Sequence, residues 1–286
     1  MENKLTLKNG RILAYAECGD PHGKPVFFFH GTPGSRIFHP PDEITVRLGV
    51  RLITIDRPGY GDSTFQPGRR ILDWPGDVVQ LADHLGIGKF AVVGHSGGGP
   101  HTLACAFALP ERISIAITLS GAGPVNAPGA TAGMTALNKF GFQFGPYIPW
   151  AIGRPLNWLV FHERSADPAK AMDREIGRRP PADDKLFRQP EVYEICLKTE
   201  LEAFRPGLIG MSWDVRLITR PWGFRLEEIN IPVRLWHGTA DNVTSISMAH
   251  YMAGKIPHSQ LTICKDEGHM LLFPHWQEIL TQLTME

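Results

Sequence analysis

The sequence of 286 residues has few cysteines, no excess of one charge and no long apolar run. Lysine and arginine (29) balance aspartate and glutamate (29), so the basic footprint of a nucleic-acid or anionic-membrane binder is missing. No continuous apolar run reaches the roughly 18 residues of a transmembrane helix. We therefore expect a small-molecule ligand and neither nucleic acid nor membrane as partner, while the oligomeric state stays open.

The cysteines are scattered and show no C-x-x-C spacing, which argues against a disulfide framework or a zinc site. We interpret all of them as reduced thiols. The first ten residues, MENKLTLKNG, contain no apolar core of a signal peptide. Together these features predict a cytoplasmic protein. The cysteines are Cys18, Cys105, Cys196 and Cys264.

Short apolar runs bounded by turn residues predict strands that are buried on both faces of a sheet. Segments with helical periodicity alternate with some of these runs, most clearly at residues 75–86. Asn9-Gly10 is typical of a hairpin turn and predicts an antiparallel start. The pattern indicates an α/β fold with a mostly parallel sheet and helices on both faces. The predicted strands are 26–30, 51–56, 90–94, 115–120, 233–238 and 260–265.

Residues 123–225 interrupt this alternation. They are rich in proline, contain no run typical of a buried strand and include amphipathic stretches such as 191–204. We predict a helical cap over 123–225, inserted into a core of residues 1–122 and 226–286. The cap should select substrates and leave the chemistry to the loops of the sheet. Apolar pocket residues are expected among its aromatics, with packing inside the cap as the alternative: Trp213, Trp222, Phe144 and Tyr147.

Ser96 stands between Gly94 and Gly98, after a predicted strand and before an apolar helix pattern. A nucleophilic hydroxyl projects well from such a tight turn, at a helix N-terminus whose free N–H groups can face an oxyanion. The turn crowds the positions two before and two after the serine, where glycine has no Cβ to collide. The alternative, a phosphate-binding loop, lacks the Walker lysine and the G-x-G-x-x-G order. The stretch therefore predicts a nucleophilic serine.

A serine hydroxyl needs a base, and the base needs a group that orients it. Asp241 follows the predicted strand 233–238, and His269 follows the predicted strand 260–265, so both should reach the sheet edge at which Ser96 lies. Asp241 and His269 are therefore the predicted acid and base. The less favoured alternatives are Asp266 or Glu267 as the acid and His275 as the base.

Acyl transfer also needs N–H donors aimed at the developing oxyanion. The backbone N–H of Gly97, next to Ser96, is one predicted donor. The second should come from the turn after the strand 26–30. We choose Thr32, because Pro33 has no N–H to give. An ordinary structural turn is the alternative.

With these residues and the segment DRPGYGDS (56–63) in view, the chain resembles the α/β-hydrolase superfamily over residues 1–122 and 226–286. The resemblance implies an eight-stranded, mostly parallel sheet, a triad of Ser96, His269 and Asp241, an oxyanion hole and a helical cap. It implies no metal and no organic cofactor. Similar proteins have a structural loop at the place of DRPGYGDS, so we expect no catalytic part for it.

Differences from particular subfamilies at the nucleophile and the residue after it exclude some of the activities that the fold supports. Haloalkane dehalogenases and epoxide hydrolases use an aspartate nucleophile, whereas this chain has Ser96. Prolyl aminopeptidases usually carry a tryptophan after the nucleophile, whereas this chain has Gly97. We expect a serine hydrolase that cleaves a small to medium, largely apolar ester through an acyl-enzyme intermediate. A short-peptide aminopeptidase, a carbon–carbon bond or lactone hydrolase, and a slow-turnover ligand receptor of the same fold stay open.

Overall fold

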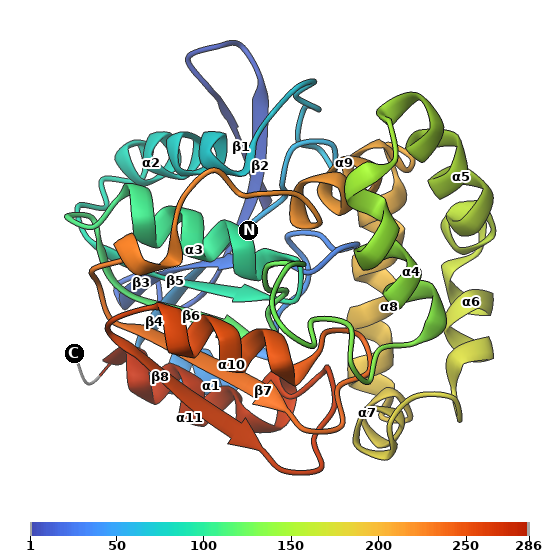
Figure 1. The fold of residues 1–286 in the computed structure, drawn as a ribbon. Helices are drawn as coiled ribbons and strands as arrows, with labels where there is room; N and C mark the ends of the chain where they lie inside the picture. The colour runs from blue at the N-terminus through green and yellow to red at the C-terminus, as the bar shows by residue number, and fades with distance from the viewer. Residues whose placement is uncertain (1, 285–286) are drawn as a thin grey trace.

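The computed structural model describes residues 2–284, and within them eight strands form one sheet (Figure 1). The strand order is β1-β2-β4-β3-β5-β6-β7-β8. Strand β2 pairs antiparallel with β1 and with β4, and the other neighbours pair in parallel. The predicted fold class is thus confirmed. The strands are β1 (Glu2–Thr6), β2 (Ile12–Gly19), β3 (Lys24–Phe29), β4 (Val50–Ile55), β5 (Phe90–His95), β6 (Ile113–Leu119), β7 (Val233–Gly238) and β8 (Ser259–Cys264).

Helices cover both faces of this sheet. On one face α3 and α10 pack over β5 to β8 and α2 packs beside α3, while α1 and α11 lie on the other face (Figure 1). Short 3₁₀ helices join some of these elements. The bounds are α1 (Asp42–Arg47), η1 (Ile71–Asp73), α2 (Trp74–His84), α3 (Gly98–Ala108), η3 (Leu226–Glu228), α10 (Ile246–Lys255) and α11 (Leu272–Thr284).

Strand β3 shows why the core has two halves. Successive side chains of a strand point to opposite faces. Phe27 and Phe29 accordingly pack in the apolar cluster beneath α2 and α3, and Val26 and Phe28 pack in the cluster beneath α11. A strand buried on both faces needs a continuous apolar run, which is the pattern that predicted it.

The segment between β6 and β7, which we call the cap, is helical. Its helices lie beside the sheet (Figure 1). The predicted limits at residues 123 and 225 fall between β6 and α4 and between α9 and η3. In the described part of the chain no helix is long and apolar enough to cross a membrane. The cap elements are α4 (Ala136–Phe144), η2 (Gly145–Tyr147), α5 (Trp150–Ala166), α6 (Pro168–Glu175), α7 (Pro181–Phe187), α8 (Pro190–Phe204) and α9 (Ile209–Ile218).

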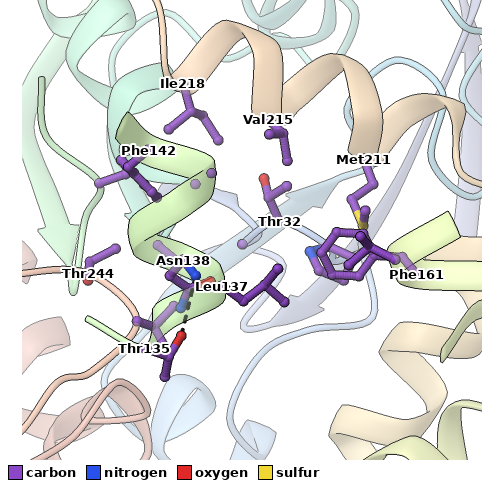
Figure 2. Close-up of a pocket in the computed structure, with 18 of the residues that line it drawn as sticks. Thr32, Thr135, Leu137, Asn138, Phe142, Phe161, Met211, Val215, Ile218 and Thr244 are labelled. Atoms are coloured by element: carbon purple, nitrogen blue, oxygen red, sulfur yellow. Dashed lines mark hydrogen bonds between the residues drawn. The ribbon is translucent and has the colours of Figure 1, made fainter. Parts of the chain in front are cut away.

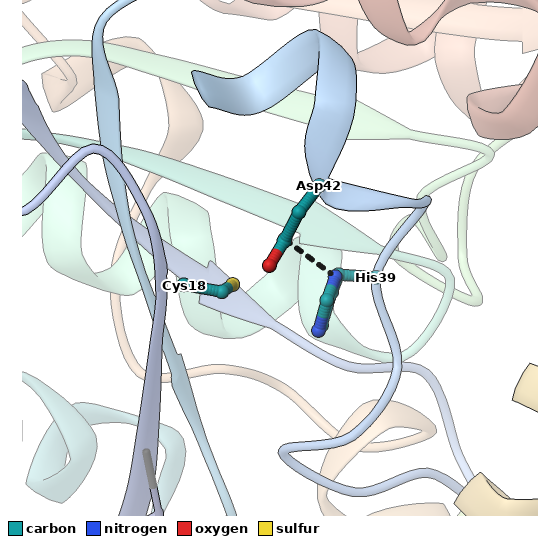
Figure 3. Close-up of side chains that lie close together, drawn as sticks. All are labelled: Cys18, His39 and Asp42. Atoms are coloured by element: carbon teal, nitrogen blue, oxygen red, sulfur yellow. Dashed lines mark ion pairs between the residues drawn. The ribbon is translucent and has the colours of Figure 1, made fainter.

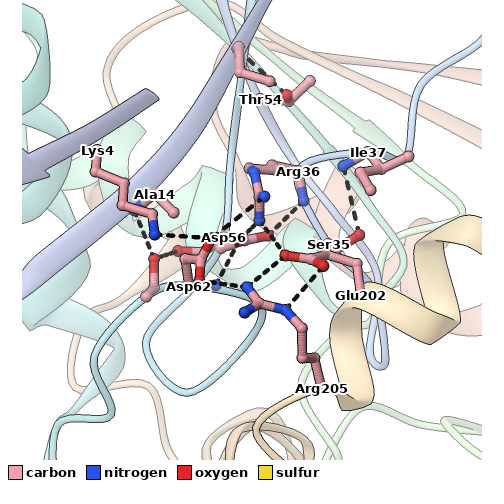
Figure 4. Close-up of polar contacts among 12 residues, drawn as sticks. Lys4, Ala14, Ser35, Arg36, Ile37, Thr54, Asp56, Asp62, Glu202 and Arg205 are labelled. Carbon is pink, nitrogen blue, oxygen red and sulfur yellow. Dashed lines mark hydrogen bonds and ion pairs between the residues drawn. The ribbon is translucent and has the colours of Figure 1, made fainter. Parts of the chain in front are cut away.

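Ion pairs tie the cap helix α8 to the core (Figure 4). Glu202 of α8 lies 2.5 Å from Arg36 Nη1, which also pairs with Asp56. Arg205, just after α8, pairs with Asp62. These contacts cross from the cap to the loops that follow β3 and β4, and so fix one side of the cap against the sheet edge.

Candidate active site

Ser96 lies in a sharp turn between β5 and α3. Its φ of 54° is in the left-handed region, which a side-chain-bearing residue rarely adopts. A Cβ on Gly94 would overlap Thr102 Oγ1, and one on Gly98 would overlap the carbonyl oxygen of Phe29. The turn therefore requires glycine at both positions, as predicted from the sequence. Ser96 is 8% exposed and lines a cavity beneath the cap.

Asp241 and His269 meet at the same edge of the sheet. Nδ1 of His269 lies 2.8 Å from Oδ2 of Asp241, which also accepts a 2.9 Å hydrogen bond from Thr244 Oγ1. The other carboxylate oxygen accepts hydrogen bonds from the N–H groups of Val243 and Thr244, at 2.8 and 3.0 Å. These bonds fix the carboxylate, and with it the orientation of the imidazole. His269 and Ser96 line one cavity.

The electrostatics of this pair favour an ionised aspartate. Burial of Asp241 opposes ionisation, but the attraction and hydrogen bond of His269 outweigh it and hold the carboxyl pKa well below its usual value. Burial likewise lowers the pKa of His269, whereas Asp241 and, to a smaller extent, Asp183 raise it by more, so that the net shift is upward from 6.5. An imidazole with a raised pKa is a stronger proton acceptor.

The alternative acid and base candidates lie elsewhere. Asp266 is exposed, and its backbone N–H donates to Thr239 Oγ1. His275 lies on α11, 3.3 Å from Glu278, against the ring of Trp236. Neither Asp266, Glu267 nor His275 lines the cavity that Ser96 and His269 share.

His95, at the end of β5, holds the loop that carries His269. Its Nε2 donates to the carbonyl oxygen of His269 at 3.0 Å, and the two ring centroids are 4.8 Å apart. Burial, together with the nearby His269, lowers the pKa of His95 to about 3. His95 is therefore a neutral hydrogen-bond donor at neutral pH and a weaker base than His269.

The turn after β3 presents the second predicted oxyanion donor. In the part of the chain that the structure describes, the backbone N–H groups of Thr32 and Gly97 have no hydrogen-bond partner. Both residues line the cavity together with Ser96. Free N–H groups beside a nucleophile are what a developing oxyanion requires.

Arg57, in the DRPGYGDS segment, braces that turn. Its Nη2 donates to the carbonyl oxygen of Gly31 at 2.8 Å, and its Nη1 donates to that of His30. His30 Nδ1 adds a 2.7 Å hydrogen bond to the same Gly31 oxygen. The carbonyl of Gly31 and the N–H of Thr32 belong to one planar peptide group, so holding the carbonyl also sets the direction of the N–H. From the sequence we expected no catalytic part for this segment, and this contact was not predicted.

The cavity beneath the cap has a volume of about 580 Å³, within the ordinary range for small-molecule sites. Figure 2 shows helix α4 on one side and α9 on the other, with Thr32 between them. The lining near the predicted nucleophile consists of Gly31, Thr32, Ser96, Gly97 and His269, and most of the remaining wall is apolar. Its main apolar members are Phe38, Leu137, Phe142, Leu156, Phe161, Met211, Val215 and Ile218.

None of the four aromatics predicted for the pocket lines this cavity. Phe144 and Tyr147 are 52% and 82% exposed. On α4 the lining ends at Phe142, and the ring of Phe144 packs at 5.1 Å against that of Phe140 without itself lining the cavity. The prediction for Phe144 and Tyr147 is therefore wrong.

The two tryptophans are structural. Trp213 Nε1 donates to the carbonyl oxygen of Arg69 at 3.0 Å, and its ring packs edge-on against Trp150. Trp222 is buried in the core cluster beneath α2 and α3, and its Nε1 donates to Ile218 at 3.1 Å. Packing, the alternative stated for these residues, thus applies, and the pocket prediction for both is wrong.

Cys18, His39 and Asp42 come close together away from this cavity (Figure 3). Burial, followed by the nearby Asp42, raises the pKa of the Cys18 thiol, which donates to the Leu52 carbonyl oxygen at 3.7 Å. His39 Nδ1 lies 2.8 Å from the Pro40 carbonyl oxygen. A protonated thiol and an occupied ring nitrogen are poor metal ligands, so we assign no ion to this group.

Comparisons with known proteins bear on this site and fold. A proline iminopeptidase of Xylella fastidiosa (strain 9a5c) is 36% identical over 117 residues, which are 38% of this chain and 36% of that protein. The match thus spans about a third of such relatives. The 2-hydroxy-6-oxononadienedioate/2-hydroxy-6-oxononatrienedioate hydrolase of Cupriavidus pinatubonensis is 27% identical over 95% of this chain and 90% of its own length. Esterase RhEst1 from Rhodococcus sp. ECU1013 shares the fold, with a TM-score of 0.72 and 18% identity over 100% of this chain and 98% of its own.

The family model described as the alpha/beta hydrolase family matches residues 26–282, which include the serine turn, the cap and the histidine loop. The eight-stranded sheet and its strand order agree with this match. The chain therefore belongs to the alpha/beta hydrolase family.

Proposed function

We propose that the protein is a serine hydrolase that cleaves a small to medium, largely apolar ester through an acyl-enzyme intermediate. The observation that carries the proposal is the Asp241–His269 pair, 2.8 Å apart, whose histidine lines the same cavity as Ser96. Ser96 Oγ attacks the ester carbonyl and His269 accepts its proton, while Asp241 orients the imidazole. The alcohol leaves with that proton, and water, activated by His269, then releases the acid from Ser96.

The oxyanion formed in each step needs donors that are in place before the reaction. The N–H groups of Thr32 and Gly97 are the donors in this proposal, and losing one such donor typically costs about 3–4 kcal/mol of transition-state stabilisation. Arg57 and His30 keep the Gly31–Thr32 peptide in one orientation. No metal or organic cofactor has a part in this mechanism.

The cavity wall favours an ester over a short peptide with a free amino group. An ammonium group needs an unengaged carboxylate, and the acidic lining residues are all engaged. Glu200 pairs with Arg164, and Glu175 pairs with Arg164 and Arg179. Asp183 binds two backbone N–H groups. These contacts leave a mostly apolar wall for the acyl or alcohol group.

The position after the nucleophile supports the same choice. A Cβ on Gly97 would overlap Thr32 Oγ1 and approach Ile218 Cδ1 of the cap helix α9. The tryptophan that prolyl aminopeptidases usually carry at this position has no room here. We therefore rank ester cleavage above aminopeptidase activity.

A fluorophosphonate probe, followed by mass spectrometry of the labelled peptide, tests the nucleophile. We expect one adduct on Ser96, none in Ser96→Ala, and unchanged labelling in Ser114→Ala, which removes a serine of β6 outside the cavity. A series of p-nitrophenyl esters and amino-acid naphthylamides then tests the substrate class. Residual turnover above about a tenth of the parent in Ser96→Ala, or a preference for naphthylamides, would contradict the proposal.

A further inference from the structure

A carboxylate of the cap binds the backbone of the loop that carries His269. Asp183 lies on α7, and its Oδ2 accepts the N–H of His269 at 2.8 Å while its Oδ1 accepts the N–H of Met270 at 2.9 Å. Asp183 is 3% exposed. A Cβ on Gly268 would overlap this carboxylate, so the loop and α7 meet without a gap. Two charge-assisted hydrogen bonds therefore fix the backbone at the predicted base.

A second cap carboxylate binds the arginine behind the oxyanion turn. Asp214 lies on α9 and is fully buried. Its Oδ2 accepts hydrogen bonds from Arg57 Nε at 2.8 Å and from Thr32 Oγ1 at 3.2 Å, and its Oδ1 pairs with Arg69. Arg57 holds the carbonyl oxygen of Gly31, as described above. Asp214 thus constrains the direction of the Thr32 N–H in two ways. It binds Arg57, which holds the Gly31 carbonyl oxygen, and it accepts a hydrogen bond from the Thr32 hydroxyl.

These contacts differ from ordinary cap packing because both involve charges that are removed from water. Moving α9 away would leave the Arg57 guanidinium, which is fully buried, without its counterion. Moving α7 away would release two N–H groups of the histidine loop. The cap and the two loops are therefore one hydrogen-bonded structure at these points.

We propose that Asp183 and Asp214 are positioning residues, through which the cap holds the His269 loop and the Thr32 turn in their reactive arrangement. This inference rests on the proposed function. Asp183 borders the cavity, but both of its oxygens are occupied by the backbone, and Asp214 lies outside the lining, so neither is assigned to the substrate. The inference departs from the expectation that the cap selects substrates and leaves the chemistry alone.

The first test compares Asp183→Asn with Asp184→Asn. Asp184 is the next residue of α7, but its carboxylate binds Gly177 and Arg188 within the cap. We expect Asp183→Asn to lower kcat on the order of 10- to 100-fold with little change in KM, because a charge-assisted hydrogen bond to the histidine loop is lost. Asp184→Asn should behave as the parent does. The fluorophosphonate labelling rate should fall in parallel with kcat.

The pH profile gives a readout that a merely structural role would not move. The charged and titratable groups that face His269 are Asp241, Asp183 and His95, with His237 on the far side of Asp241. Removing the negative charge of Asp183 should move the acidic limb of kcat/KM to lower pH. Asp184→Asn should leave that limb in place.

The second test compares Asp214→Asn with Glu202→Gln. Glu202 also joins the cap to a core arginine, Arg36, but touches neither the His269 loop nor the Thr32 turn. Both variants should lose thermal stability. Only Asp214→Asn should also lose labelling rate and kcat per folded molecule, again on the order of tenfold or more. The folded fraction is measured by near-UV circular dichroism.

The outcomes separate this inference from the proposed function. A parent protein whose Ser96 resists the probe and cleaves no ester refutes the proposed function. An active parent with Asp183→Asn equal to Asp184→Asn, and Asp214→Asn equal to Glu202→Gln, refutes the inference alone. If Asp183→Asn does not fold, amide hydrogen exchange of the parent protein tests the inference instead. Slow exchange of the His269 and Met270 amides, matching α7, supports the inference, and rapid exchange beside a protected α7 overturns it.

Discussion

Asp241 and His269 are joined by a 2.8 Å contact, and the same carboxylate accepts three hydrogen bonds from its own loop. Asp241→Asn keeps the shape but favours the wrong imidazole tautomer, so we expect kcat to fall by on the order of 10⁴. Steady-state ester hydrolysis measures this. Asp266→Asn, in the exposed part of the histidine loop, is the control and should stay near the parent value. A small loss in the first variant with a severe loss in the control would reassign the acid.

Acid should abolish activity before it unfolds the protein. His269 must be neutral to accept a proton, and its pKa lies above 6.5, so kcat/KM should fall as pH drops through that raised value. The depressed pKa of Asp241 contributes stability that is fully present above 3.8 and is lost only as pH falls through its lower folded-state value. The raised pKa of His269 contributes stability below 6.5, which is lost as pH rises through the folded value. Activity and circular dichroism, recorded on one pH series, test this order.

Phe161 of α5 lines the cavity, and truncating it should change which esters fit. Each lost apolar contact is worth roughly 1–3 kcal/mol, so Phe161→Ala should shift the ratio of kcat/KM between short and long acyl chains by about tenfold or more. Fluorophosphonate labelling should change little. Trp222→Ala is the contrast, because it should cost about 3–5 kcal/mol of stability and leave that ratio unchanged. The reverse pattern in the two variants would reinstate Trp222 as a pocket residue.

Gly94 should tolerate no side chain, because a Cβ there would overlap Thr102 and the carbonyl of Gly98. We expect Gly94→Ala to lose about 1–3 kcal/mol of unfolding free energy, or more, and to disturb the Ser96 turn. Gly76→Ala, on α2 with nothing within 4 Å of the added Cβ, should be neutral or more stable by up to about 1 kcal/mol. Chemical denaturation compares them, and equal stabilities would show that the turn can relax.

The sheet could be predicted because its signals are local. A run such as Val26 to Phe29 is apolar on both faces, and this requirement holds for any strand between two helical layers. The Asp241–His269 contact could also be expected, since loops after neighbouring parallel strands open at one edge. In these cases topology alone brings distant residues together.

The contacts of the cap could not be predicted in this way. Asp183 and His269 are 86 residues apart in the sequence, and Asp214 and Arg57 are 157 apart. Helix packing brings each pair together, and no local sequence pattern indicates that packing. The number of aromatic residues in the cap also did not identify the pocket. Phe142 and Phe144 are the same residue type, but only Phe142 lines the cavity, while Phe144 is exposed. One signal was available for Arg57, namely an arginine two residues after the buried strand β4, where an uncompensated charge requires a partner.

The buried Arg57–Asp214 pair also limits how this protein could be redesigned. A chimera that receives the cap of another family member would inherit Arg57 from the core without Asp214 from the insert. The buried guanidinium without its counterion would destabilise every such chimera, whatever residues line the new pocket. Exchange of specificity by swapping whole caps therefore has to carry both partners, or to begin by replacing Arg57.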